Sequence, residues 1–377
     1  MGTRSPAPFL DLGPLELKGL PEPVPIYEVL WERRTGPSFP LPPLLDRAGQ
    51  WSFVGRDNQF GDLRVLWKEA AGGKRGVALL GGEPGVGKTR LAVELARAVH
   101  ADGALVLAGR CDEDLGVPYQ PFAEALRHFV DSAPGSGGGR GPRLGRYGGD
   151  LARLVPEVEE RFPGLPPRLR SDPDSERLRL FEAVAAWLTA AAEAEGPVLL
   201  VVDDLHWAAK PTLLMLRHLI ATTGAVKLLV VATYRDSDLT PGHPLAELLA
   251  DLHREERVER FPIAGLDEDG VRDFLAAAAG HDLEGEDLEV ARAVHAETSG
   301  NPFFVGEVIG HLRESGAVVR RQGRWVSGVP VADLGIPEGV RDVVGRRLRR
   351  LSDAANNVLR SAAVVGVEFD LDVVQSM

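Results

Sequence analysis

This chain has few of the features that mark secreted, membrane or nucleic-acid-coating proteins. Its 377 residues include one cysteine, Cys111, which excludes an internal disulfide framework. We interpret it as an ordinary buried thiol rather than a reactive one. No apolar run approaches the ~20 residues of a membrane span or forms a signal peptide, and the net charge of -12 argues against coating nucleic acid or an anionic membrane. We therefore expect a soluble, cytoplasmic protein that does not bind membranes.

Lysine is scarce as well, and one lysine lies in a glycine-rich segment. The chain has six lysines, namely Lys18, Lys68, Lys74, Lys88, Lys210 and Lys227. Lys88 belongs to the pattern Gly82-x4-Gly87-Lys88-Thr89, which stands between an apolar run at 77–80 and a stretch of helical spacing at 90–101. A strand before and a helix after this pattern make it a candidate phosphate-binding loop.

The segment Gly82-Glu83-Pro84-Gly85-Val86-Gly87-Lys88-Thr89 has the residue types that a triphosphate site needs. Its glycines let successive backbone N–H groups face one anion, and the start of the following helix adds its positive dipole end. Lys88 is expected to reach the β- and γ-phosphates, and the Thr89 hydroxyl to ligate Mg²⁺. We predict that this segment, together with Arg90, binds ATP or ADP with Mg²⁺.

Two acids follow another apolar run and extend the predicted site. The run at 199–202 is followed by Asp203 and Asp204. A carboxylate at the end of a strand beside a phosphate loop can hold Mg²⁺, and its neighbour can polarise an attacking water. We assign Asp203 to the metal and Asp204 to water activation. Because Asp is shorter than the Glu often found at the second position, we expect slow hydrolysis.

The next apolar run ends in Thr233-Tyr234-Arg235. A polar residue at this edge can sense the γ-phosphate, and Arg235 is predicted to stabilise charge during catalysis; the alternative is a surface arginine at a strand end. Of the residues after the acids, we interpret His206 as a loop residue and Trp207 as a packing residue.

The order of apolar runs divides the chain into five parts. Residues 1–35 contain two short alternating runs typical of a hairpin, and residues 36–50 form a Pro-rich linker. Residues 51–265 alternate helices and strands, which predicts an α/β domain with a parallel sheet covered on both faces. Residues 266–316 contain short helices, and residues 317–377 contain a hairpin around Gln322-Gly323 followed by helices. This last part suggests a winged-helix-like unit, truncated by the end of the chain.

The expected elements can be given by residue number. Strands are predicted at 77–80, 104–107, 198–202, 227–232 and 258–263. Helices are predicted at 57–71, 90–101, 176–195, 211–222, 268–279, 288–298 and 303–315, and from Pro337 and Ser352. Residues 132–149 are rich in glycine, and we expect them to be a mobile surface insertion without a regular element.

Motifs along residues 51–377 resemble the AAA-type, Orc1-like ATPase module of bacterial STAND regulators. They are Phe53-Val54-Gly55-Arg56-Asp57, Gly109-Arg110-Cys111-Asp112 with Pro118-Tyr119-Gln120-Pro121, Asp203-Asp204-Leu205-His206-Trp207, Ala232-Thr233-Tyr234-Arg235 and Ser299-Gly300-Asn301-Pro302-Phe303-Phe304. This module is found in LuxR-type transcriptional activators and behind class III adenylate cyclase domains. The resemblance implies a P-loop NTPase with a five-stranded sheet in the order 5-1-4-3-2, a helical lid and a winged helix that closes over the nucleotide.

The same resemblance implies roles for residues outside the phosphate loop. Val54, Gly55 and Arg56 line the adenine side, and Pro302 contacts the base from the lid. Residues 12–27 look similar to the last two strands of a class III nucleotide cyclase domain. The metal-binding aspartates of that family are missing, so we predict no cyclase activity.

The function implied by the resemblance is a nucleotide-operated signalling switch. ADP holds the lid and winged helix closed, ATP favours an open form that self-associates or binds a protein partner, and slow Mg²⁺-dependent hydrolysis resets it. One alternative is a DNA-binding transcriptional regulator that acts through the winged helix, with the basic run Arg341, Arg346, Arg347, Arg349 and Arg350 on phosphates. We favour an ordinary packing helix for that run. The other alternative is an ATP-binding scaffold without hydrolysis.

Overall fold

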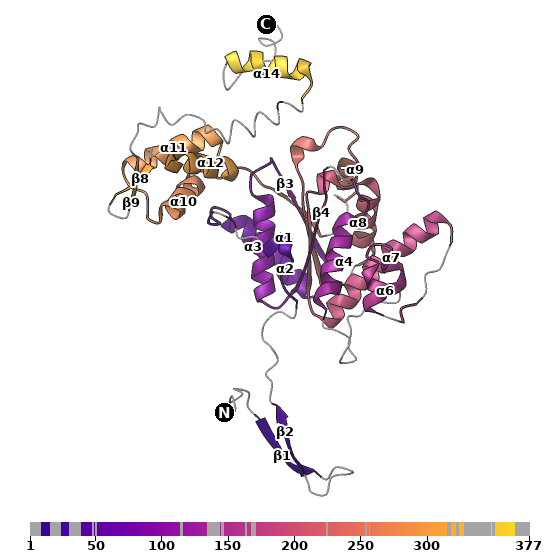
Figure 1. Ribbon diagram of the computed structural model, residues 1–377. Coiled ribbons are helices and arrows are strands. Elements are labelled where there is room, and N and C mark those ends of the chain that lie inside the picture. The colour runs from indigo at the N-terminus through magenta and orange to yellow at the C-terminus, as the bar shows by residue number, and fades with distance from the viewer. Residues whose placement is uncertain are drawn as a thin grey trace.

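The structure is a computed structural model of the chain. It describes residues 9–15, 24–29, 39–46, 49, 51–113, 116–133, 144, 147–162, 164–166, 171–223, 225–252, 255, 257–314, 318–321, 324–327, 348 and 351–365. These residues form a central sheet covered by helices, a group of helices that follows it in sequence, and two small hairpins (Figure 1).

A five-stranded parallel sheet forms the centre of the fold (Figure 1). Its strands, in spatial order, are β4 (Leu105–Arg110), β5 (Val198–Asp203), β6 (Leu228–Thr233), β3 (Gly76–Gly81) and β7 (Val258–Pro262). Every neighbouring pair is parallel. Counted along the chain this order is 2-3-4-1-5, which is 5-1-4-3-2 read from the other edge, so the predicted sheet is confirmed. Parallel strands end at one edge, and the loops that follow all these strands meet there.

Apolar runs form the inner strands because both faces of the sheet are buried. Val77 and Leu79 of β3 pack into one core, and Ala78 and Leu80 pack into the core on the opposite face. Successive side chains of a strand point to opposite faces, so a strand covered on both sides has no polar positions. All six residues of β3, β5 and β6 are buried accordingly.

Helices cover each face of the sheet. The helices that pack on one face are α1 (Pro43–Asp46), α2 (Asp57–Ala71) and α3 (Lys88–Ala101). Those on the other face are α4 (Gln120–Ser132), α5 (Gly148–Leu151), α6 (Glu157–Arg161), α7 (Pro173–Ala194), α8 (Lys210–Thr222) and α9 (Pro244–Leu252). The predicted helices in this domain are confirmed within a few residues, whereas the sequence did not predict α1, α4, α5, α6 and α9.

The prediction of a mobile insertion at 132–149 is wrong at its C-terminal end. Gly148 and Gly149 lie in the buried helix α5, and Leu144 is buried in the same core. A side chain at Gly148 would meet Leu165 and Leu144, so this glycine allows close packing. The remaining residues of the insertion at 134–143 and 145–146 lie outside the described residues.

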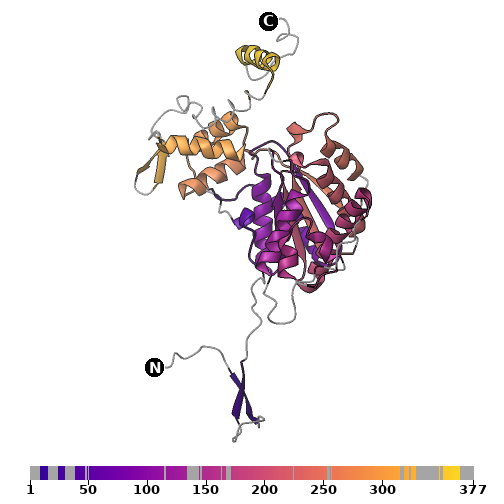
Figure 2. The same ribbon diagram turned by 45° about the vertical axis from the view of Figure 1, so that its right-hand side comes forward.

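Three helices after the sheet form a lid with its own core. They are α10 (Glu268–Ala279), α11 (Glu286–Thr298) and α12 (Pro302–Glu314), and they bury a separate apolar cluster. Asp267 begins α10 as its N-cap, because its carboxylate accepts a hydrogen bond from the backbone N–H of Gly270 at 2.8 Å. Figures 1 and 2 both place these helices beside the sheet domain. The three helices predicted here are confirmed.

The two ends of the chain carry small hairpins. Antiparallel pairs form between β1 (Phe9–Leu15) and β2 (Val24–Val29), and between β8 (Val318–Arg321) and β9 (Arg324–Ser327), as predicted. The helix α14 (Asp353–Val365) follows. The helix predicted from Pro337 and its five arginines lie outside the described residues. Among the described helices, none is long and apolar enough to cross a membrane.

Candidate nucleotide-binding site

The loop after β3 is wrapped around its own lysine. The Lys88 ammonium donates hydrogen bonds to the carbonyl oxygens of Gly82 and Glu83, both at 2.8 Å. Gly82, Gly85 and Gly87 have φ angles of 150, 85 and 97°, which L side chains rarely adopt. The helix α3 begins at Lys88, so its free N–H groups lie at the end of the loop. The loop therefore has the backbone of an anion-binding site.

Lys88 is only 7% exposed, and both cationic and anionic side chains act on it. Burial, followed by repulsion from Arg235, lowers the pKa of Lys88, whereas the carboxylates of Asp204, Asp236 and Asp203 oppose that shift. An ammonium group that is poorly hydrated and close to another cation interacts strongly with an added anion. This environment favours a phosphate ligand.

Two hydroxyl groups converge on one oxygen of Asp203. Thr89 Oγ1 donates to Asp203 Oδ1 at 2.7 Å, and Thr233 Oγ1 donates to the same oxygen at 2.6 Å. Burial and the neighbouring Asp204 raise the pKa of Asp203, while both hydrogen bonds and Arg110 oppose that rise. The structure thus brings together the two residues that the sequence assigned to the metal.

The donor set around Asp203 fits Mg²⁺. Hydroxyl and carboxylate oxygens suit this ion, which is usually held by one or two carboxylates with the rest of its shell from phosphates and water. Within the part of the chain that the structure describes, no group of three or more His, Cys, Asp or Glu forms a candidate metal site. A site that needs nucleotide phosphates is consistent with both facts. Bound there, Mg²⁺ would neutralise charge on the phosphate oxygens.

The second acid, Asp204, is paired with an arginine from the neighbouring strand. Asp204 Oδ2 accepts hydrogen bonds from Nη2 and Nε of Arg110 at 2.6 and 2.9 Å. Burial alone would lower the pKa of Arg110, but its hydrogen bond to Asp204 and the nearby acids raise it. The strand register that sets Arg110 opposite Asp203 produces this pair. Both hydrogen bonds end on Oδ2, so Arg110 competes with a water molecule for one of the two carboxylate oxygens.

Arg235 lies at the same end of the pocket. Its guanidinium carbon is 4.6 Å from the centre of the Trp207 ring, and Nη1 is 3.7 Å from Asp238 Oδ2. His206, interpreted from the sequence as a loop residue, lies in the one-turn 3-10 helix η2 (Leu205–Trp207) and is buried. Burial lowers the pKa of His206 to about 4. Its imidazole is therefore neutral at pH 7.

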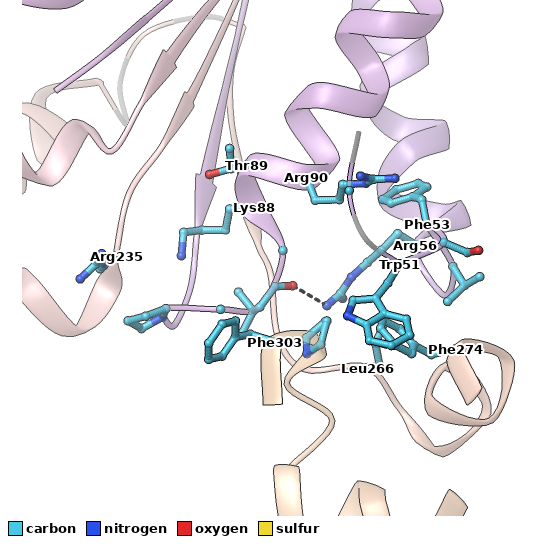
Figure 3. Close-up of a pocket in the computed structure, with 18 of the residues that line it drawn as sticks. Trp51, Phe53, Arg56, Lys88, Thr89, Arg90, Arg235, Leu266, Phe274 and Phe303 are labelled. Carbon is cyan, nitrogen blue, oxygen red and sulfur yellow. Dashed lines mark hydrogen bonds between the residues drawn. The ribbon is translucent and has the colours of Figure 1, made fainter. Parts of the chain in front are cut away.

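The pocket itself has a cationic side and an aromatic side. It encloses about 390 Å³. Figure 3 shows Lys88, Thr89 and Arg235 toward one side and Trp51, Phe53 and Phe274 toward the other, with Phe303 below the loop. These two chemistries match a nucleotide, whose phosphates are charged and whose base is flat and apolar on its faces.

Arg56, which the resemblance places on the adenine side, lines the pocket and also hydrogen-bonds to two backbone carbonyl groups. Its guanidinium donates to the carbonyl oxygens of Val86 and Ala264, at 3.0 and 2.5 Å, although it also lines the pocket (Figure 3). Burial lowers the pKa of Arg56, and Asp267 opposes the shift. Arg56 therefore connects the phosphate loop to the segment that leads into the lid.

The lid also touches the phosphate loop directly. Asn301 Nδ2 donates to the carbonyl oxygen of Pro84 at 2.9 Å, and the N–H of Phe303 donates to that of Gly85 at 3.3 Å. A side chain at Gly85 would lie 2.7 Å from Asn301 Oδ1 and 3.0 Å from Phe303 Cβ. Gly85 thus allows the turn before α12 to approach the loop.

Most predicted site residues meet at this pocket. Those that line it are Val54, Arg56, Pro84, Gly85, Val86, Gly87, Lys88, Thr89, Arg90, Asp204, Arg235 and Pro302. Gly82, Glu83 and Asp203 contact its lining residues through the hydrogen bonds given above. Gly55 has a φ of 66° and approaches the backbone of Gly270, so it lies against the first lid helix. Its role at the adenine stays a prediction.

Sequence reasoning gave no role to several lining residues. They are Trp51, Phe53, Arg110, Leu266, Phe274 and Phe303. Phe53, Arg110 and Phe303 belong to quoted motifs, so position beside a motif was an available signal. Trp51 and Phe274 pack together, with ring centres 5.8 Å apart, although they are far apart in sequence. No local pattern indicates such a pair.

Comparison with known proteins finds a family model that matches the part of the chain holding this site. Residues 52–231, a little under half of the chain, match the model of the AAA ATPase domain family. The matched residues begin just before Phe53-Val54-Gly55-Arg56 and include the phosphate loop and both acids. Together with the parallel sheet and the site geometry, this match supports an AAA-type ATPase module.

A curated relative and several solved structures are similar to the chain over greater lengths. An uncharacterized protein of Rhizobium meliloti (strain 1021) is 24% identical over 98% of this chain, which spans about a third (34%) of that protein's length. The Orc1 protein of Aeropyrum pernix in complex with DNA is 19% identical, with a TM-score of 0.43 over 88% of this chain and 78% of its own. A Walker-type ATPase of Pyrococcus abyssi is 12% identical, with a TM-score of 0.49 over 88% and 91%.

Proposed function

We propose that this chain is a Mg²⁺-dependent ATPase of slow turnover that acts as a nucleotide-operated switch of the STAND type. The observation that carries the proposal is the convergence of the phosphate loop, the acid pair and the lid turn on one pocket. A pocket whose walls belong to two units changes the contact between those units when its ligand changes. Such a pocket is suited to control the lid as well as to hold the nucleotide.

The lid contacts support the switch part of the proposal. Asn301 and Phe303 reach the carbonyl side of the loop whose amide side faces the phosphates, and Arg56 joins Val86 to the start of the lid segment. A shift of the loop on phosphate binding therefore reaches the lid through backbone groups. In our proposal ADP keeps these contacts, and ATP favours an open form that self-associates or binds a protein partner.

Slow hydrolysis is supported by the state of Asp204. The acid proposed to activate water is hydrogen-bonded to Arg110 through one oxygen and has the short side chain of aspartate. Arg110 therefore competes with water for one oxygen of this acid, which slows proton transfer. The proposed rate of hydrolysis thus depends on the strength of this ion pair.

The experiment that tests the function is nucleotide binding by calorimetry. Lys88→Ala removes the ammonium from the loop, and we expect no measurable binding of Mg·ADP or Mg·ATP. The matched control is Lys74→Ala, which removes an exposed lysine just before β3, at the opposite end of that strand. It should bind both nucleotides like the wild type. Unchanged affinity in the Lys88 variant would contradict the proposed site.

A further inference from the structure

Two short turns beside the phosphate side of the pocket bring four side chains together. His206 and Trp207 come from η2, Arg235 precedes the one-turn helix η3 (Asp236–Asp238), and Asp238 ends it. The rings of His206 and Trp207 are 4.5 Å apart, and the Arg235 guanidinium lies over the Trp207 ring. Asp238 Oδ2 is 3.7 Å from Arg235 Nη1 and 3.5 Å from His206 Nε2. The arginine is thus held between an aromatic face and a carboxylate.

Arg235 nevertheless belongs to the nucleotide pocket. Its side chain lines the cavity with Lys88 and Asp204. Arg235 also acts on the phosphate lysine, since repulsion from Arg235 is second only to burial among the causes that lower the pKa of Lys88. The guanidinium can therefore act on an anion bound at Lys88 while its ion pair is made with Asp238.

We propose that Trp207 and Asp238 are positioning residues for Arg235, and that Asp238 holds the guanidinium until the γ-phosphate of ATP takes its place. The inference rests on the proposed function and deepens it. ADP has no γ-phosphate, so in its presence Arg235 stays with Asp238. The exchange of partners lets the site distinguish ATP from ADP.

The physical basis is the difference between the two partners of Arg235. An ion pair at 3.7 Å between partly exposed side chains contributes little, because water screens it. A terminal phosphate offers more charge and several acceptor oxygens, and arginine can bind two of them at once. The Trp207 ring contacts the face of the guanidinium, so the N–H groups along its edge stay available to either acceptor. Trp207 can hold Arg235 in both states.

Asp238 has other contacts that keep it in place when Arg235 leaves. Ser237 Oγ donates to Asp238 Oδ1 at 3.1 Å. His206, whose side chain is 0% exposed, lies beside Oδ2. Neither contact involves Arg235, so both can persist when Arg235 moves to another acceptor.

A double-mutant cycle tests the exchange. Binding of Mg·ADP and of Mg with a non-hydrolysable ATP analogue is measured by calorimetry for the wild type, Asp238→Asn, Arg235→Ala and the double variant. Asp238→Asn removes the competitor, so the analogue should bind about two- to fivefold more tightly while Mg·ADP is unchanged. Arg235→Ala should weaken the analogue about tenfold or more. Mg·ADP should change by a smaller factor, because Arg235 also acts on Lys88. In the Arg235→Ala background, Asp238→Asn should have no further effect.

The matched control separates the exchange from simple loss of negative charge. Asp236 lies on the same turn, and its carboxylate also acts on Lys88. Asp236→Asn should therefore shift both nucleotides in the same direction. Trp207→Phe, which keeps an aromatic face, should retain more discrimination between the two nucleotides than Trp207→Leu.

Clear results would overturn the inference. If Asp238→Asn tightens the analogue equally in the Arg235→Ala background, the effect is general electrostatics and the exchange is wrong. Asp238→Asn that weakens the analogue would show that Asp238 supports binding rather than competes. Failure of the wild type to bind Mg·ADP would instead remove the proposed function itself, so the two failures are distinguishable.

Discussion

The two sides of the nucleotide pocket are built in different ways. On the phosphate side, Lys88 and Thr89 belong to one loop, and Asp203 and Thr233 end adjacent strands of the same sheet. On the base side, Trp51 precedes the first long helix, while Phe274 and Phe303 belong to two different lid helices. The phosphate side is therefore fixed by the sheet, whereas the base side is formed jointly by the segment before α2 and by the lid helices.

The phosphate loop links the nucleotide site to the lid. Arg56 joins the loop carbonyl of Val86 to Ala264, and Asn301 joins the lid turn to Pro84. Both connections use backbone carbonyls of the loop, which leaves the loop amides free for phosphate. The phosphate loop thus contacts the elements that form both sides of the pocket.

The largest expected effect is the loss of ATP turnover when the proposed proton acceptor on the phosphate side is removed. Asp204→Asn keeps the shape of the side chain but removes the proton acceptor, so we expect ATP turnover to fall about a hundredfold or more. Affinity for Mg·ATP should stay within about twofold, because Lys88, Thr89 and Asp203 are untouched. Phosphate release and calorimetry measure the two quantities. Asp251→Asn, an exposed acid paired with Arg217, is the control; an unchanged rate in Asp204→Asn would refute its role.

A smaller effect separates the base side from the phosphate side. Trp51→Ala removes an aromatic face of the pocket, and we expect ATP to bind about tenfold more weakly. Inorganic tripolyphosphate has no base, so its affinity should be the same in the variant and the wild type. Trp51→Phe serves as the control that retains a ring. Equal losses for both ligands would mean that Trp51 acts on the phosphate loop, contrary to the division of the pocket.

The smallest expected effect tests the ion pair between Arg110 and Asp204 at the edge of the sheet. Arg110→Ala releases Asp204 from its ion pair, so we expect turnover at saturating ATP to rise about two- to fivefold. The Arg110 side chain is 48% exposed, which limits the strength of the pair and hence the gain. Arg110→Lys keeps a cation there and should change the rate less. A slower rate in Arg110→Ala would show that this arginine assists the reaction instead of restraining Asp204.

The sequence predicted the sheet and the phosphate side because both depend on local patterns. Apolar runs marked β3, β5 and β6 since strands buried on both faces need such runs. The glycine spacing and Lys88 marked the loop, and Asp203 and Asp204 were marked by their position after a strand. The sequence did not predict the helices α1, α4, α5, α6 and α9. It indicated a mobile segment at 148–149 because composition alone does not reveal close packing.

The base side could not be predicted to the same depth. Trp51 and Phe274 are brought together by the docking of the lid, and Arg56 reaches Ala264 across more than two hundred positions. The resemblance pointed to the segment 54–56, but not to the carbonyl groups that Arg56 binds. The absence of cyclase activity and the role of the arginines at 341–350 stay predictions.

The sequence by itself determined the order of strands and helices, the phosphate loop and the acids that face it, because hydrophobic period and glycine spacing act over a few residues. Only the tertiary structure decided which residues close the pocket, that Arg110 holds Asp204, and that Arg235 lies between Trp207 and Asp238. These contacts join segments that are distant in sequence, and their geometry follows from strand register and lid packing, which no local pattern encodes.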